Sequence, residues 1–188
     1  MRINFITTNT LKFEIAQAFF QKLDGDYELK QYAIDTPEIQ DNSVEAIARQ
    51  SALWAANQTG VPCIKMDVGF YIEALNGFPG PFVKYVNEWL SQDDILRLVK
   101  TKNNRNAYFE DALAIAYPDG TAKVFSHKSG GVLSESVDLK HPKWTMYSLF
   151  IPKGHSHTLG SMSDDEQKQY WGDGSWPKLI QFLEGTTT

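Results

Sequence analysis

The chain has 188 residues, of which 42% are hydrophobic and 22% charged, a balance typical of a globular domain with a sizeable core rather than of a disordered chain. The formal net charge of -5 argues against nucleic-acid polymers and anionic membranes as partners, although a local basic pocket for phosphate stays possible. Cys63 is the only cysteine, which excludes an intrachain disulfide and a cysteine metal cluster.

The sequence also predicts the compartment. The amino terminus, MRINFITTNT, lacks the long apolar core of a signal peptide, and no uninterrupted apolar run reaches membrane-spanning length. A single cysteine suits a reducing compartment. We therefore expect a soluble, cytoplasmic protein that folds as a single domain over residues 1–188.

The first part of the chain alternates strand and helix patterns. Residues 2–7 alternate apolar and polar side chains, as a strand does, and lead into a polar loop before helical periodicity begins. Asn9 or Thr10 is available as the N-cap of that helix. A second strand is expected over 27–34 and a second helix over 44–59, which would pack on the sheet.

The stretch over residues 61–82 places a lone carboxylate, Asp67, between an apolar strand-like run and a glycine-rich turn at 76–80. We expect Asp67 to lie at a strand end beside this turn, where α/β proteins usually keep their chemistry. Taken alone, the stretch is equally well interpreted as an ordinary strand with a solvated acid.

The region from residue 105 onward predicts antiparallel strands. A strand over 105–117 should turn at Pro118-Asp119-Gly120 into a second strand over 122–127. Gly130-Gly131 is expected to break that strand, and 132–137 to continue the sheet as its partner. An α/β fold with a mixed sheet is the economical prediction.

Further helices complete the predicted elements. Apolar helical patterns cover 84–89 and 93–100, and Ser163 to Glu166 is a candidate helix start. A closing helix is expected over 176–183, with Pro177 in its first turn.

Several common catalytic signatures are absent from the sequence, including the phosphate-binding Gly-x-x-x-x-Gly-Lys loop and the His-Glu-x-x-His zinc motif. His155 and His157 have a metal-ligand spacing, but solvated loop histidines are the better interpretation.

An oxygen-rich arrangement remains. Glu38 and Asp67 could hold a hard divalent cation such as Mg²⁺, which prefers carboxylates, water and substrate phosphates. The phosphate oxygens would be received by donors near the start of the first helix: Thr7, Thr8, Asn9 and Lys12. This pattern suits phosphoryl chemistry on a nucleotide. A capped helix without a ligand and a dipole-favoured Glu38 are the alternatives.

Four segments resemble the inosine triphosphate pyrophosphatase family, also called the Ham1-like non-canonical purine nucleoside triphosphate pyrophosphatases. They are TTNTLK at 7–12, PEIQ at 37–40, DVGF with ALNGFPG at 67–80, and NRNAYF at 104–109. The order and spacing match over nearly the whole chain. The resemblance implies an elongated mixed β-sheet flanked by helices, two lobes around a central cleft, a homodimer, and magnesium-dependent hydrolysis of a nucleoside triphosphate to monophosphate and pyrophosphate.

The resemblance also implies site residues. Thr7, Asn9 and Lys12 look like the triphosphate-binding start, Glu38 like a metal ligand, and Asp67 like the catalytic or metal-binding carboxylate. Lys12 is assigned to catalysis as well as to substrate binding. The rest of the substrate-binding set is Thr8, Trp144 as the aromatic that stacks on the base, Tyr147 and Lys168.

The sequence departs from the family pattern around the base. Met66 replaces the first of two adjacent acids, and Val68 replaces the Ser or Thr that usually follows them. Ser51 stands where many members have a lysine. Tyr147 replaces an Asp that would read the base edge, and residues 170–176, YWGDGSW, replace a Ser-His-Arg motif.

Two functions therefore stay open at this stage. The first is a nucleoside triphosphate pyrophosphatase with altered base preference, in which Trp171, Trp176 and Tyr147 either form an aromatic base pocket or are core side chains. The second is a nucleotide-binding or interaction protein with weakened catalysis.

Overall fold

The computed structural model describes residues 1–37, 39–137 and 145–185. Its contacts divide the chain into two compact units, each built from separate stretches of sequence. Unit 1 comprises Met1–Asp67, Asp111–His127 and Lys168–Thr188, and unit 2 comprises Val68–Glu110 and Lys128–Gln167. The assignment of residues 1–188 to a single domain stays a prediction.

The elements alternate between strands and helices along the first part of the chain and are mainly strands in the middle. In chain order they are β1 (Arg2–Ile6), α1 (Thr10–Phe20), β2 (Glu28–Tyr32), α2 (Val44–Thr59), β3 (Cys63–Ile72), η1 (Glu73–Leu75), β4 (Pro79–Gly80), α3 (Val83–Trp89), α4 (Gln92–Val99), β5 (Asn106–Ala116), β6 (Ala122–Leu133), β7 (Phe150–Pro152), η2 (Leu159–Ser161), α5 (Asp164–Gly172) and α6 (Trp176–Leu183).

The sheet is mixed, as predicted. Its strand order is β2-β1-β3-β5-β6-β7, with β4 paired to β3. β1 runs parallel to both β2 and β3, whereas β6 and β7 are antiparallel. This arrangement confirms an α/β fold with helices flanking a mixed sheet.

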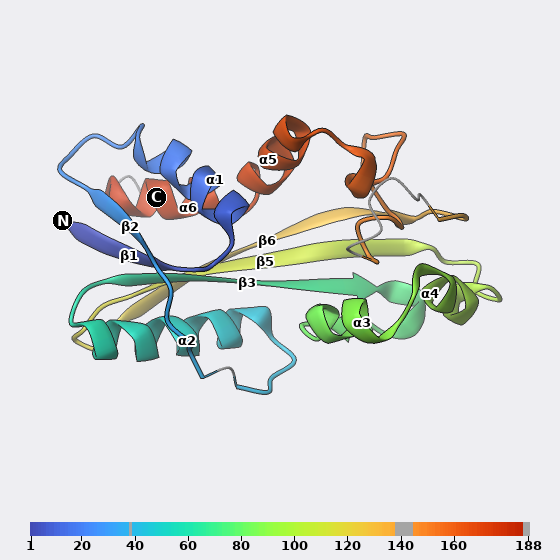
Figure 1. Ribbon diagram of the computed structural model, residues 1–188, viewed down its shortest axis with the longest axis horizontal. Helices are drawn as coiled ribbons and strands as arrows, with labels where there is room; N and C mark the ends of the chain where they lie inside the picture. The colour runs from blue at the N-terminus through green and yellow to red at the C-terminus, as the bar shows by residue number, and fades with distance from the viewer. Residues whose placement is uncertain (38, 138–144, 186–188) are drawn as a thin grey trace. The chain divides into compact units, whose positions relative to one another are not determined.

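In unit 1, helices cover both faces of the parallel strands (Figure 1). Successive side chains of a strand point to opposite faces. Phe5 of β1 meets the ring of Trp176 in α6 edge-on at 5.4 Å. The next residue, Ile6, belongs to a buried cluster that includes Val44, Ala48 and other small side chains of α2. One strand therefore supports α6 on one face and α2 on the other.

Unit 2 has an aromatic core. The ring of Phe70 in β3 lies 4.5 Å from that of Phe109 in β5 and 5.4 Å from that of Phe150 in β7. The predicted glycine-rich turn follows β3, and Asn76 (φ 54°) and Gly77 (φ 88°) adopt its left-handed backbone conformation.

The expected strand break at Gly130-Gly131 was wrong, because β6 continues through both glycines to Leu133. The separate strand over 132–137 was therefore also wrong. Gly131 pairs with Pro152 of β7, and an added Cβ there would lie 2.2 Å from the carbonyl oxygen of Ile151. Glycine is thus required at position 131 by close packing, not by a turn.

We expect Gly131→Ala to destabilise the protein by about 1–3 kcal/mol, the usual cost of overpacking. Gly130→Ala is the matched control, because a Cβ on Gly130 meets nothing within 4 Å. Its expected effect is neutral or stabilising by about 0.4–1 kcal/mol. Urea unfolding of the two variants measures both values, and equal midpoints would contradict the packing explanation.

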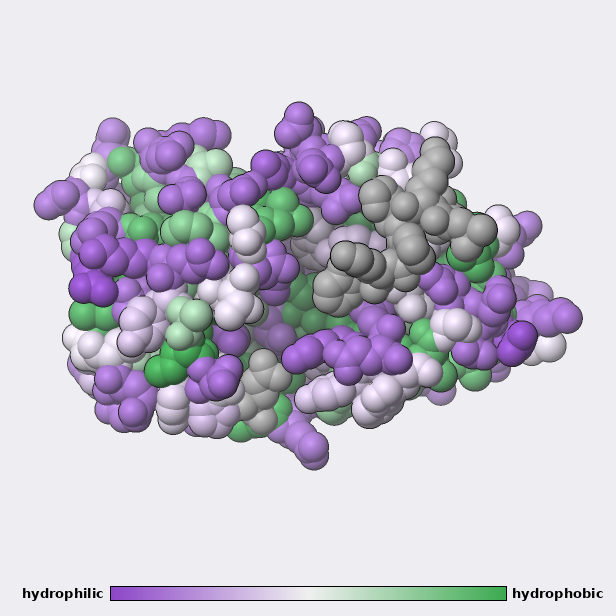
Figure 2. Space-filling view, in the orientation of Figure 1, coloured by the Kyte–Doolittle hydropathy of each residue, from purple (hydrophilic) through white to green (hydrophobic). Residues whose placement is uncertain are grey.

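The helix termini follow local sequence signals. Asn9 caps α1, and Ser43 caps α2, which ends at the left-handed Gly60. Among the described residues, no helix is long and apolar enough to cross a membrane. Figure 2 shows hydrophilic side chains over most of the visible face, with hydrophobic ones in smaller separate patches.

Candidate active site in unit 1

The loop between β1 and α1 is ordered by its own polar side chains. Asn9 Oδ1 accepts the backbone N–H of Lys12 at 3.0 Å, and Thr7 Oγ1 accepts that of Asn9 at 3.1 Å. These bonds confirm Asn9 as the N-cap. They also fix the amino end of α1, where the helix dipole favours negative charge.

Asp67 lies within β3, four residues after Cys63 and five before the end of the strand at Ile72. The expectation that it sits at a strand end was therefore wrong, because β3 continues past Asp67 through residues 68–72, VGFYI, before the turn begins. Asp67 is half-buried, and its Oδ2 atom is shielded from solvent.

The strand pleat separates Asp67 from its neighbour Met66. Lys65 and Asp67 share one face of β3, while Met66 points to the other and is 6% exposed. An acid at position 66 would therefore lie on the other face of β3 from Asp67. In this chain the buried Met66 side chain occupies that position.

Two parallel pairings set the direction in which these residues follow one another on neighbouring strands. Ile6, the last residue of β1, pairs with Tyr32 at the end of β2, and Phe5 pairs with Ile64 of β3. β3 then continues to Asp67 in the direction in which β1 leads to Thr7 and Thr8. Gln31 Nε2 also donates to the carbonyl oxygen of Thr7 at 3.2 Å. The loop after β1 therefore begins at the carboxyl end of a parallel strand, which is the usual ligand position in α/β sheets, and Asp67 lies on the adjoining strand β3.

Lys65, on the same face of β3 as Asp67, was missed by the sequence reasoning. Its Nζ donates to Thr36 Oγ1 at 3.0 Å. The spacing of two residues from Asp67 in a strand is the signal that could have found it.

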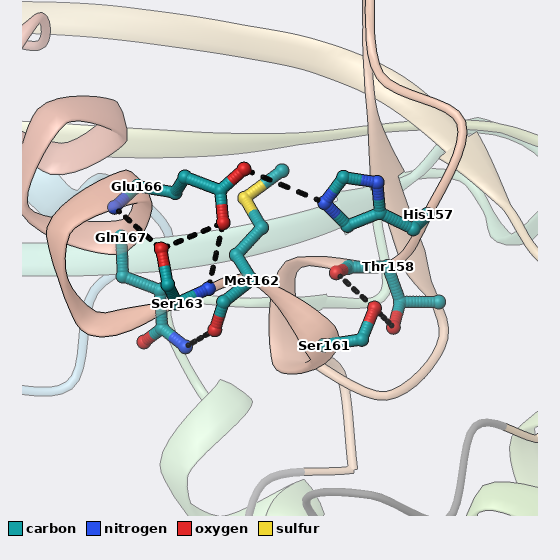
Figure 3. A network of polar contacts seen from close by, with 7 residues as sticks. All are labelled: His157, Thr158, Ser161, Met162, Ser163, Glu166 and Gln167. Atoms are coloured by element: carbon teal, nitrogen blue, oxygen red, sulfur yellow. Dashed lines mark hydrogen bonds and ion pairs between the residues drawn. The ribbon is translucent and has the colours of Figure 1, made fainter.

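The His155–His157 pair precedes the start of α5. Figure 3 shows His157 beside Glu166, whose Oε1 lies 3.9 Å from His157 Nε2. Glu166 also accepts the backbone N–H of Ser163 at 2.8 Å, so it belongs to the capping box that starts α5. Hydrogen bonds from Ser163, with a smaller contribution from His157 and His155, hold the pKa of Glu166 below its usual range. In the described ranges, no three His, Cys, Asp or Glu side chains are grouped to hold a metal.

Comparison with known proteins decides the family. The model of the Ham1 family matches residues 3–171. The chain belongs to the Ham1 family. It is 32% identical to a dITP/XTP pyrophosphatase of Thermococcus kodakarensis, covering 90% of this chain and 89% of that protein. It is also 32% identical to a protein of the same name from Korarchaeum cryptofilum, over 95% and 94% of the two chains.

Solved Ham1 structures share the fold. The Staphylococcus aureus Ham1 protein superposes with a TM-score of 0.83 at 22% identity, covering 100% of both chains. A HAM1 protein from Coxiella burnetii gives a TM-score of 0.82 at 18% identity, covering 97% of this chain and 98% of that chain. At these identities the likeness establishes the fold alone.

The described residues fit the metal that membership of the Ham1 family suggests. Asp67 supplies a half-buried carboxylate within β3, whereas Glu38 lies outside the described residues. Mg²⁺ binds through one or two carboxylates together with water and substrate phosphates. A single described carboxylate is compatible with that mode.

The predicted base-binding residues are dispersed along the chain. Trp144 lies outside the described residues. Tyr147, in unit 2, is half-buried, and its ring meets that of Phe109 edge-on at 5.8 Å. Lys168, in unit 1, forms an ion pair with Glu14 of α1 at 2.8 Å, and the two side chains are 41% and 46% exposed. Ion pairs that water reaches in this way contribute little stability.

Trp176 does not contribute to an aromatic base pocket. It is 1% exposed and packs against Phe5 and, at 6.2 Å, against Phe19 of α1. Trp171 is also buried, at 7% exposure. The interpretation of these two tryptophans as core side chains is confirmed.

The segment that replaces the Ser-His-Arg motif is held by a buried carboxyl that the sequence reasoning missed. Asp111 Oδ2 accepts the backbone N–H of Ser175 at 3.0 Å. An added Cβ on Gly174 would lie 2.7 Å from Asp111 Oδ1, so glycine is needed for this approach. Burial raises the pKa of Asp111, and the lowering effects of the Ser175 hydrogen bonds and of His127 are smaller. An acid directly before the apolar run at 112–116 was the available signal.

The raised pKa of Asp111 predicts a pH effect on stability. Because the pKa of Asp111 is higher in the folded than in the unfolded protein, its protonated carboxyl stabilises the fold. This contribution is full below the usual aspartate pKa of about 3.9 and is lost as pH rises through the pKa of the folded state. We therefore expect Asp111→Asn to become more stable relative to wild type as pH increases. Unfolding midpoints of both proteins across this range measure the difference, and a constant or falling difference would refute the expectation.

Proposed function

We propose that this chain hydrolyses a non-canonical or modified nucleoside triphosphate to the monophosphate and pyrophosphate, with Mg²⁺ as cofactor. What supports the proposal is that β1 and β3 are parallel neighbours with Phe5 opposite Ile64, so that the ordered Thr7–Asn9 loop and Asp67 follow these paired residues on adjoining strands. It is supported by the dITP/XTP pyrophosphatase name of relatives that are 32% identical.

In this proposal the loop and the first turn of α1 bind the triphosphate. Backbone N–H groups at the helix start and the Lys12 ammonium receive phosphate oxygens. The hydroxyls of Thr7 and Thr8 donate further hydrogen bonds, while the Asn9 cap keeps the loop in shape. These contacts stabilise negative charge that shifts towards the leaving pyrophosphate.

Asp67 orients the attacking water and accepts its proton. The water oxygen bonds to the α-phosphorus while the bond from that phosphorus to the bridging α–β oxygen breaks, and pyrophosphate leaves with the electron pair. Mg²⁺, held by Asp67 and Glu38, would supply positive charge to the phosphates.

The base is bound by residues beyond the phosphate site. We propose that Trp144 stacks on it and that Tyr147 lies near its edge. Lys168 would leave its weak pair with Glu14 to reach the substrate.

The test is pyrophosphate release from a panel of canonical, deaminated and modified nucleoside triphosphates, with Mg²⁺, with Mn²⁺ and with EDTA. Release from deaminated purine nucleotides that stops with EDTA is expected. Nucleotide binding without turnover across the whole panel would favour the alternative, a catalytically weakened nucleotide-binding protein. The buried position of Met66 argues against that alternative.

We also propose a cytoplasmic homodimer, as the family resemblance implies. Light scattering of the purified protein tests the dimer. Fractionation of cells that express it tests the location.

A further inference from the structure

Lys65 stands two residues before Asp67 on β3. Because strand side chains alternate, Cys63, Lys65 and Asp67 share one face. Cys63 on this face is fully buried against α2, whereas Lys65 and Asp67 are half-buried. Along this face of β3, the side chains thus change from a buried thiol at Cys63 to charged groups at Lys65 and Asp67.

The helix opposite this face has small side chains. Thr59 Oγ1 of α2 lies 3.2 Å from Cys63 Sγ, and the short connection at 60–62 turns the chain back along the helix. Two strand residues advance about 6.6 Å, which equals about four helical residues. By this arithmetic Lys65 is about level with the buried Ala55 of α2.

A buried hydroxyl lies further along the same helix. By the same arithmetic, Ser51 is about level with Asp67. It is 0% exposed, and its Oγ has no hydrogen-bond partner among the described residues. Buried hydroxyls are usually hydrogen-bonded. We therefore expect a polar partner for the Ser51 hydroxyl at this level of the helix.

The ammonium group of Lys65 is held by a hydrogen bond within unit 1. Its Nζ donates to Thr36 Oγ1 at 3.0 Å, from the segment that follows β2. Lys12 lies in the first turn of α1, which follows β1, the parallel neighbour of β3. Lysines on two elements of unit 1 suit an anion with several oxygens.

We propose that Lys65 is a second phosphate-binding lysine of the active site, contacting non-bridging oxygens of the triphosphate while Thr36 fixes its ammonium. The inference rests on the proposed function. It differs from the sequence-based assignment, in which Lys12 is the cation for the phosphates. Lys65 approaches from the strand that carries Asp67, whereas Lys12 approaches from α1.

The test uses inorganic tripolyphosphate as the probe and calorimetry as the measurement. Lys65→Met is expected to weaken tripolyphosphate binding by about 10- to 100-fold, the effect of losing a charge-assisted hydrogen bond. Lys65→Arg, which retains the charge, should restore most of the affinity. Lys30→Met on β2 is the matched control, because Lys30 pairs with Glu28 at the surface, and it should bind as wild type.

Two results would overturn the inference. One is unchanged tripolyphosphate affinity in Lys65→Met. The other is a large loss of thermal stability in Lys65→Met with weak binding that Lys65→Arg does not rescue, because that result indicates a structural lysine. A wild-type protein that binds tripolyphosphate but cleaves no nucleotide of the panel would instead refute the proposed function, and the effect of Lys65 on binding would still support the inference.

Discussion

Replacing Asp67 by asparagine is expected to lower kcat for pyrophosphate release by about 10²- to 10⁴-fold, the range that a positioned general base contributes. Asparagine keeps the shape of the side chain but can neither accept a proton nor offer a charged ligand to Mg²⁺. Because Asp67 is half-buried on a strand interior, the backbone around it should stay in place. Steady-state kinetics with the best substrate of the panel measures the loss.

The control is the same substitution at an exposed acid, Asp24→Asn, in the turn after α1. It should leave kcat and thermal stability as in wild type. The thermal midpoint of Asp67→Asn should also stay within a few degrees of wild type. Wild-type turnover in a folded Asp67→Asn protein would rule out Asp67 as the catalytic carboxylate.

Trp176→Ala is expected to cost about 3–5 kcal/mol of unfolding free energy, as for other large aromatic side chains removed from a core. Trp176 is 1% exposed, and its ring contacts those of Phe5 in β1 and Phe19 in α1. The substitution therefore leaves a cavity where α6, α1 and the sheet meet. Chemical denaturation with urea measures the change.

Trp89→Ala provides the contrast, because Trp89 at the end of α3 is 72% exposed. Its expected effect is within about 0.5 kcal/mol. Trp176→Phe should fall between the two, since it retains an aromatic ring in the core. If Trp176→Ala were as mild as Trp89→Ala, α6 would not be part of the core of unit 1.

Local signals in the sequence were sufficient for most elements. Asn9 and Thr10 were the two predicted caps of α1, because their side chains directly precede the helical periodicity, and Asn9 is the one that caps the helix. The closing helix was predicted over 176–183 and observed there, with Pro177 in its first turn. The mixed sheet was expected from the change of pattern at residue 105, and the strand pairings confirm it.

The errors occurred where contacts distant in sequence set the outcome. Gly130-Gly131 has the composition of a strand break, yet β6 continues because β7, some twenty residues later, pairs with it and requires glycine at 131. Asp67 was placed at a strand end because it is a charged residue between an apolar run and a glycine-rich turn. Strand pairing extends further, to Ile72.

By itself, the sequence determined the fold class and the capped start of α1, because both depend on periodicity and capping within a few residues. Only the tertiary structure decided that Lys65 and Thr36 meet, that Asp111 holds the Ser175 backbone, and that Met66 and Trp176 belong to the core. These facts depend on which strand face and which helix lie together. That information resides in the pairing of β1 with both β2 and β3, which no single stretch of residues contains.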